Sequence, residues 1–261
     1  MLHSLIVGID RHADPQIRPL RSARADASAI ARVVRDRLAE ERQVTLLLDE
    51  DATKARVERF LTEELPARVA PDDTVLLYFA GYGAPDIDPA TGDPSVHLVL
   101  HDTRFLELFA TALNVVSELS AWLRRLPVSM VTTVLDASFS GAPGGRTFEG
   151  PGLWNGPRIR RLERTSCARL AFGMQCAVLT ACTDKELARE DDGNGVFTRQ
   201  LLAFLDRSDV RGAVRLDALH TAVAAAVRDA SAGAQTPVLH GTASNRVVFR
   251  LAGRPVEQAT A

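Results

Sequence analysis

The chain has 261 residues, of which 46% are hydrophobic and 25% charged, and its formal net charge is −2 at pH 7. This composition is typical of a globular protein with a sizeable core, and the near-neutral charge argues against nucleic acid or an anionic membrane as a partner. The three cysteines, Cys167, Cys176 and Cys182, form no CxxC pair, which argues against a disulfide framework or a zinc site. No apolar stretch is long enough for a membrane span and no signal-peptide pattern is present, so we expect a cytoplasmic protein.

Short apolar runs alternate with longer amphipathic stretches, beginning near the N-terminus. We expect strands at Leu5–Ile9, Val44–Leu48, Thr74–Phe79, His97–Leu100, Val131–Leu135 and Ala177–Ala181. We expect helices at Ala25–Leu38, Val116–Arg125, Phe197–Asp206 and Leu216–Ala230. A further helix is expected to begin after Thr53, whose side chain would cap it. This alternation predicts an α/β fold whose mostly parallel sheet is covered by helices on both faces.

A Pro- and Gly-rich stretch, 141-GAPGGRTFEGPG-152, predicts a mobile loop at about 141–165. Strand and helix patterns resume beyond it, so we expect one domain over residues 1–261. In parallel sheets, working residues gather at the carboxyl ends of the strands. That edge is expected to bring together Asp10, Arg11 and His12 after the first strand, Tyr82 after the third, and Asp136 and Ser138 after a later one.

Several segments resemble the caspase-like cysteine peptidases, and among them the bacterial metacaspase relatives often called orthocaspases. The matching segments are 6-IVGIDRHADPQIRPLRSARADA-27, 72-DDTVLLYFAGYGA-84, 133-TVLDASFSGAPGG-145, 179-LTACTDKELARED-191, 194-NGVFTRQLL-202 and 236-TPVLHG-241. They follow the order of the family and cover most of the chain. The resemblance implies a three-layer α-β-α sandwich around a mostly parallel six-stranded sheet.

The resemblance places Tyr82 where the family has its catalytic histidine and Ser138 where it has its cysteine nucleophile. The peptidase mechanism needs an easily ionised thiol and a neighbouring group that exchanges a proton near neutral pH. Tyrosine has an ordinary pKa of about 10, so it is a poor base at pH 7. A serine hydroxyl depends on a base even more than a thiol does. We therefore expect these two catalytic positions to be inactive.

Other features of the family remain. Gly83 and the amide of Ser138 match the backbone donors of the oxyanion hole, and Asp26 and Asp136 match the acids that bind a substrate Arg or Lys in metacaspase-like members. Asp26 is also interpretable as a first-turn helix acid and Asp136 as a strand-end acceptor. Active relatives are clipped after a basic residue of the predicted loop, and the matching candidates expected to be exposed are Arg146, Arg158, Arg160 and Arg161.

The main hypothesis is a catalytically inactive, pseudo-orthocaspase domain that binds a protein or peptide with an exposed Arg or Lys, or that regulates an active caspase-like relative. The alternative is a hydrolase that uses Ser138 with a different base, such as His12 or, as a second candidate, His101, and cleaves after Arg or Lys. A third hypothesis is a scaffold whose cleft has closed around Asp26 and Asp136. We expect no cofactor and no metal: some relatives use calcium, but the run 190-EDDGNG-195 does not have EF-hand spacing and predicts a turn before a helix.

Overall fold

A computed structural model describes most of the chain. The described residues are 1–38, 41–88, 90–139, 144–148, 150, 175–191, 193–207, 209–241 and 245–252. The predicted mobile loop at about 141–165 lies outside the described residues, except for 144–148 and 150.

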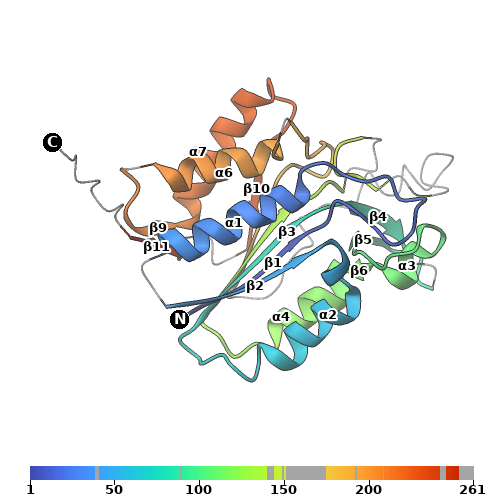
Figure 1. Cartoon of the computed structure of the whole chain (residues 1–261), viewed down its shortest axis with the longest axis horizontal. Helices are drawn as coiled ribbons and strands as arrows, with labels where there is room; N and C mark the ends of the chain where they lie inside the picture. Colours follow the sequence, from blue (N-terminus) through green and yellow to red (C-terminus); the bar gives the residue numbers. More distant parts are fainter. Residues whose placement is uncertain are drawn as a thin grey trace.

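A six-stranded sheet forms the centre of the molecule (Figure 1). Its strands, in spatial order, are β10 (Val238–His240), β8 (Cys176–Thr180), β7 (Met130–Asp136), β3 (Thr74–Ala80), β1 (Leu2–Gly8) and β2 (Arg42–Leu48). Five of them run parallel, and β10 pairs antiparallel with β8 at one edge. The predicted α/β fold with a mostly parallel six-stranded sheet is confirmed.

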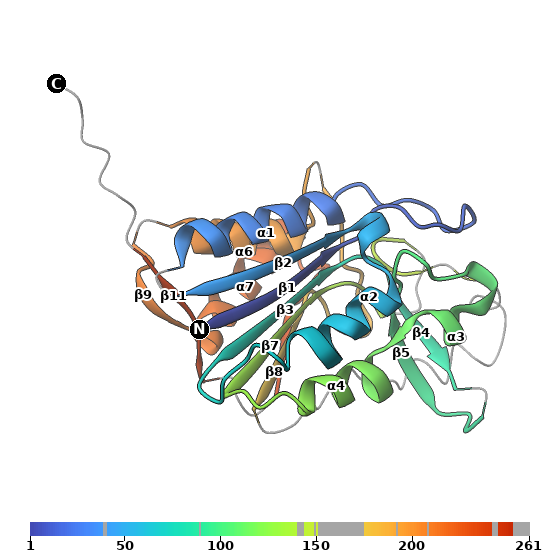
Figure 2. The same cartoon turned by 60° about the horizontal axis from the view of Figure 1, so that its bottom comes forward.

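Helices cover both faces of this sheet, as Figure 2 shows. One face carries α1 (Ala23–Arg37), α6 (Val196–Asp206) and α7 (Leu216–Ala230). The other carries α2 (Lys54–Arg59), extended by a π-helical turn at Phe60–Glu64, and α4 (Ser120–Arg124), preceded by a π-helical turn at Val115–Leu119. The side chain of Thr53 accepts a hydrogen bond from the Arg56 amide, which confirms the predicted N-cap of α2.

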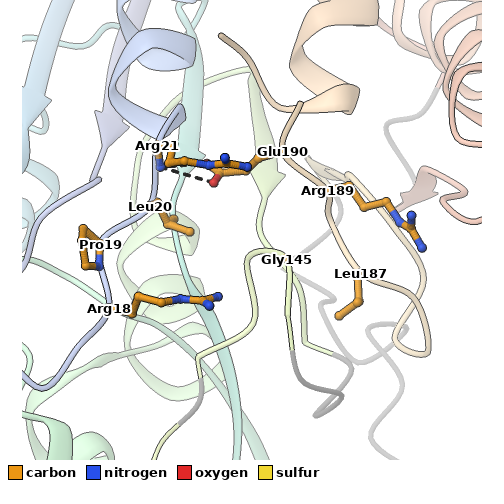
Figure 3. A pocket seen from close by; sticks show the side chains of 8 residues that line it. All are labelled: Arg18, Pro19, Leu20, Arg21, Gly145, Leu187, Arg189 and Glu190. Atoms are coloured by element: carbon orange, nitrogen blue, oxygen red, sulfur yellow. Dashed lines mark hydrogen bonds between the residues drawn. The ribbon is translucent and has the colours of Figure 1, made fainter. Parts of the chain in front are cut away.

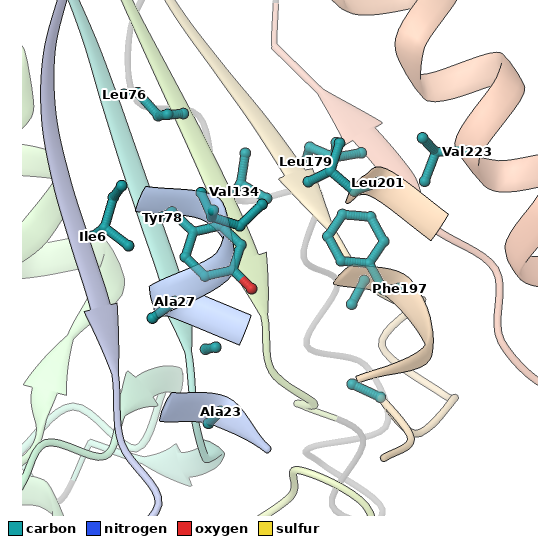
Figure 4. Packing of buried hydrophobic residues seen from close by; sticks show 14 of the residues in the cluster. Ile6, Ala23, Ala27, Leu76, Tyr78, Val134, Leu179, Phe197, Leu201 and Val223 are labelled. Atoms are coloured by element: carbon teal, nitrogen blue, oxygen red, sulfur yellow. The ribbon is translucent and has the colours of Figure 1, made fainter. Parts of the chain in front are cut away.

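The alternation of side chains along the strands divides the core into two layers. On β1, Leu5 and Val7 pack against α2 and α4, whereas Ile6 packs against α1 and α6 together with Leu76 and Tyr78 of β3. Figure 4 shows this second layer, in which the Tyr78 ring lies among aliphatic side chains beneath α1. The four central strands, β1, β3, β7 and β8, are buried on both faces, so they appear in the sequence as nearly continuous apolar runs.

Two small sheets flank the main one. The first contains β4 (Gly83–Ile87), β5 (Pro94–Leu98) and β6 (Leu113–Asn114), with a 3-10 turn at Phe105–Glu107 and the short helix α3 (Leu108–Thr111) nearby. The second pairs β9 (Gly212–Arg215) with β11 (Val247–Leu251), and a further 3-10 turn spans Asp49–Asp51. The expected strand at His97–Leu100 overlaps β5, which belongs to this separate antiparallel sheet. The sixth main strand is β10, which is too short to give a periodic signal.

Candidate functional site

The predicted site lies at the carboxyl end of the central strands. Tyr82 follows β3, and Ser138 follows β7, whose last residue is Asp136. Asp26 lies in the first turn of α1, which begins after the loop that leaves β1. Asp26, Asp136 and Ser138 are all fully buried, and Tyr82 is 3% exposed. The strand ends thus gather these residues from distant parts of the chain, but away from solvent.

The two aspartates bind an arginine of the same chain. The Nη2 group of Arg146 pairs with Asp26, its Nη1 group lies 2.9 Å from Asp136 Oδ2, and the guanidinium is fully buried. Nη2 also lies 3.5 Å from Glu190 Oε1 and donates to the Ser22 hydroxyl at 3.1 Å. The pocket that could hold a basic side chain is therefore already filled by one.

Further hydrogen bonds fix the two carboxylates. Asp26 accepts from Asn194 Nδ2 at 2.7 Å and from the Gly195 amide at 2.9 Å. Asp136 accepts from Thr198 Oγ1 at 2.6 Å, and the hydroxyl groups of Thr198 and Tyr78 are 2.5 Å apart. Each acid is therefore held by partners on other elements as well as by Arg146.

Burial affects the charges of this cluster. Loss of hydration raises the pKa of Asp136 to about 6, although Arg146 acts in the opposite direction. Desolvation likewise holds the pKa of Tyr78 well above its ordinary value. The pKa of the Arg146 guanidinium is raised by Asp136 and Asp26 despite its burial, so it keeps its positive charge.

The backbone of Arg146 occupies the two donors expected to form the oxyanion hole. The amides of Gly83 and Ser138 both donate to the carbonyl oxygen of Arg146, at 2.9 and 3.2 Å. The Arg146 amide donates to the carbonyl of Ala188 at 2.9 Å, and Thr147 forms a parallel bridge with Gly83. The segment 144–148 thus turns at its two glycines and then lies in the cleft beside Gly83, with its basic side chain in the acidic pocket and the carbonyl of Arg146 at the two amides.

Ser138 is enclosed as well. Its Oγ accepts a hydrogen bond from the Ala188 amide at 2.5 Å and lies 4.0 Å from the Sγ of Cys182. Cys182 and Cys176 are both buried, whereas Cys167 lies outside the described residues. The hydroxyl at the nucleophile position is therefore engaged with the backbone of the loop that follows β8.

Tyr82, at the position expected for the catalytic histidine, packs among aromatic side chains. Its ring centroid is 5.8 Å from that of His12 and 6.5 Å from that of Phe148. Neither ring nitrogen of His12 has a hydrogen-bond partner among the described residues, and burial lowers its pKa to about 4. The Nδ1 of His101 donates to the carbonyl of Arg11 at 2.8 Å. Neither histidine is hydrogen-bonded to Ser138 in this arrangement.

The role of Arg146 was not predicted from the sequence. We expected it to be exposed with the other arginines of the loop, and this expectation was wrong, since Arg146 is fully buried. Arg158, Arg160 and Arg161 lie outside the described residues. Glu190 was also missed: its carboxylate accepts from the Ser22 amide and hydroxyl as well as pairing with Arg146. The signal available in the sequence was the charge balance, because two buried aspartates need a cation.

Within the described part of the chain, no group of three or more His, Cys, Asp or Glu side chains has an arrangement that could hold a metal ion. The acidic residues before α6 form ion pairs: Glu190 pairs with Arg146, and Asp191 pairs with Arg199. None of the described helices combines the length and apolar character required to span a bilayer.

Comparisons with known proteins agree with this architecture. A family model described as the caspase domain matches residues 2–248. A crystal structure of a protein from Geobacter sulfurreducens aligns with a TM-score of 0.67 at 20% identity, covering 94% of this chain and 97% of that one. The crystal structure of caspase-1 from Spodoptera frugiperda aligns with a TM-score of 0.54 at 11% identity, covering 100% and 92%. At such identities the two structures establish the fold alone, and a comparison with curated proteins found no match.

Proposed function

The chain belongs to the caspase-domain family, and we propose that it is a peptidase-inactive member that acts by binding a protein partner. One observation carries the proposal: Arg146 of the chain itself fills the acidic pocket with its side chain and engages the two backbone donors with its carbonyl. A cleft occupied in this way cannot accept a substrate until the segment leaves. We therefore propose that the chain is a pseudoenzyme that resembles the orthocaspases.

The side chains at the two catalytic positions support the same proposal. Tyr82 carries a phenol, which is ordinarily a weak base at neutral pH, and it lies in an aromatic cluster. Ser138 has a hydroxyl in place of a thiol, and that oxygen already accepts a backbone hydrogen bond. Displacing the segment 144–148 would open the cleft without restoring a base or a thiol nucleophile.

The partner we propose presents an exposed Arg or Lys, which would replace Arg146 between Asp26 and Asp136. An active caspase-like relative is one such partner, since its own basic loop could enter this cleft and be held without being cut. Arg146 is tethered, so its effective concentration at the pocket is on the order of millimolar or higher. A partner must therefore make further contacts beside the pocket to compete with it.

The alternative, a hydrolase that uses Ser138 with His12 as base, receives less support. Both nitrogens of His12 lack a hydrogen bond to any described residue, so none links it to Ser138. With a pKa lowered to about 4, its imidazole is also a weak base at pH 7.

Hydrolysis of fluorogenic peptides tests the proposal. The panel carries Arg, Lys or Asp before the scissile bond, and the purified chain is compared with Ser138→Ala, with and without calcium. We expect no turnover by either protein, because both lack the thiol and the base. Turnover by the natural chain that disappears in Ser138→Ala would overturn the proposal and favour the hydrolase.

A restored variant extends this test. The variant Tyr82→His/Ser138→Cys places an imidazole and a thiol at the two positions expected to be catalytic. The Arg146 carbonyl already lies at the two backbone donors beside them. We expect cleavage of the chain itself after Arg146, seen as two fragments by intact-mass analysis, whereas either single change should leave the chain intact. If the folded double variant cuts neither itself nor the panel, the loss of activity extends beyond these two side chains.

A further inference from the structure

A cavity of about 460 Å³ opens beside the filled cleft (Figure 3). One wall comes from the loop before α1, with Arg18, Leu20 and Arg21, and the other from the loop before α6, with Leu187 and Arg189. Gly145, the residue that precedes Arg146, lies between the two walls. The cavity therefore adjoins the segment in the cleft on the N-terminal side of its basic residue.

The charge of this cavity is positive. Arg21 and Arg189 are exposed, and neither guanidinium forms an ion pair with a described residue. The one acid in the lining, Glu190, is already matched by Arg146 and by the Ser22 amide and hydroxyl. Two guanidinium groups thus remain available to a ligand, and such groups bind carboxylates through paired, charge-assisted hydrogen bonds.

The backbone of the cavity is also available. Gly145 is half-buried, and its N–H and C=O groups form no hydrogen bond with a described residue. A peptide that passes Gly145 can form hydrogen bonds with these two groups. Leu20 and Leu187 give the walls an apolar part that suits the methylene groups of a glutamate side chain.

We infer that this cavity binds an acidic peptide segment of a partner, with its carboxylates on Arg21 and Arg189. The inference deepens the binding role proposed above and rests on it. Arg21 and Arg189 lie outside the segment 144–148, so they supply contacts that a partner needs in order to compete with the tethered Arg146. A nucleotide fits less well, because no aromatic side chain lines the cavity to stack on a base.

Fluorescence anisotropy with labelled hexaglutamate tests the inference on the full chain. We expect saturable binding that weakens with added salt, and no binding of labelled hexaglutamine. In Arg21→Gln/Arg189→Gln the Kd should rise by about tenfold or more, because two charged contacts are lost. The matched control is Arg32→Gln/Arg35→Gln, which removes the same charge from exposed positions of α1, and its Kd should stay within about twofold of the natural value.

Three results would overturn the inference. Equal loss of affinity in the two double variants would show a general charge effect. Equal binding of hexaglutamine would show that the carboxylates of the peptide are not what the cavity recognises. Displacement of hexaglutamate by inorganic phosphate at millimolar concentration would make the cavity a phosphate site instead. These outcomes are distinct from failure of the proposed function, which the hydrolysis assay detects. Circular dichroism of each variant verifies its fold, and Arg189→Glu should abolish binding if the cavity is the site.

Discussion

Arg146 brings one positive charge to a pair of fully buried carboxylates, Asp26 and Asp136. The cluster therefore keeps an excess of negative charge in a region without water to screen it. Two of its polar atoms, Asp136 Oδ1 and Arg146 Nε, have no hydrogen-bond partner among the described residues. A proton on Asp136 would relieve the excess charge, which is why burial and the neighbouring Asp26 raise the pKa of this acid.

The raised pKa of Asp136 predicts a dependence of stability on pH. The pKa in the folded chain is about 6 and the ordinary value is 3.8, so between these values the folded state holds the proton more tightly. The contribution of Asp136 to the free energy of unfolding is therefore highest below pH 4 and is lost as the pH rises to about 6. Over this window the loss is on the order of 3 kcal/mol.

Urea unfolding of the natural chain and of Asp136→Asn between pH 4 and 7 measures this contribution. Asparagine stays neutral, so the variant should gain stability relative to the natural chain as the pH rises, and the difference should level off above about pH 6.5. The control is Asp217→Asn, since the exposed pair with Arg215 lowers the pKa of Asp217. The difference in free energy of unfolding between Asp217→Asn and the natural chain should change little with pH, and in the direction opposite to that for Asp136→Asn. A constant difference for Asp136→Asn would contradict the prediction.

At the scale of secondary structure, the segment 144–148 is a turn followed by a single bridge to β4. Thr147 bridges to Gly83 at the start of β4, and the Phe148 amide donates to the Gly83 carbonyl at 2.8 Å. On its other side the Arg146 amide reaches Ala188 in the loop after β8. Backbone pairing on both sides explains how a short, Gly-rich stretch is held in the cleft, and it is the way in which such clefts hold extended peptides.

Gly145 makes this placement possible. Its φ of +55° falls in the left-handed region, and a Cβ there would lie 2.5 Å from the Ala188 carbonyl oxygen. We therefore expect Gly145→Ala to loosen the segment and to speed trypsin cleavage after Arg146 by about tenfold or more, since proteases cut locally opened backbone. Mass spectrometry of timed digests under native conditions measures the rate.

Gly193→Ala is the matched control for this experiment. Gly193 also has a positive φ, of +90°, but a Cβ there would meet nothing within 4 Å. Its substitution carries the cost of the left-handed backbone without the collision, so cleavage after Arg146 should change by no more than about twofold. Equal acceleration in the two variants would mean that the contact with Ala188 does not hold the segment.

Over the whole molecule, the features predicted from the sequence are those that depend on the periodicity of apolar residues and on the order of the strands. Apolar runs and amphipathic stretches located the five parallel strands and the main helices, and the edge where parallel strands end brought Tyr82, Asp136 and Ser138 together. Arg146 could not be predicted in the same way, because its place depends on an ion pair with Asp26, 120 residues away, and its own segment has no periodic pattern. Likewise, the run at His97–Leu100 indicated a strand but not the sheet to which it belongs.

Arg146 also joins parts of the molecule that are distant in sequence: α1 through Asp26, the end of β7 through Asp136, and the loop before α6 through Glu190. Removing one member of a buried ion pair leaves the others unpaired and without water, which costs far more than losing a surface pair. The cluster should therefore affect the global free energy of unfolding and not only the cleft.

We expect Arg146→Met to lower the free energy of unfolding at pH 7 by about 3 to 5 kcal/mol, because methionine fills similar space but leaves two buried carboxylates without a cation. The control, Arg199→Met, breaks the exposed pair with Asp191 and should cost no more than about 1 kcal/mol. Urea titrations of both variants measure the two losses. The loss for Arg146→Met should shrink at pH 4, where Asp136 is protonated and needs no partner. A loss equal to that of the surface control would show that the carboxylates are hydrated and that the cleft stands open.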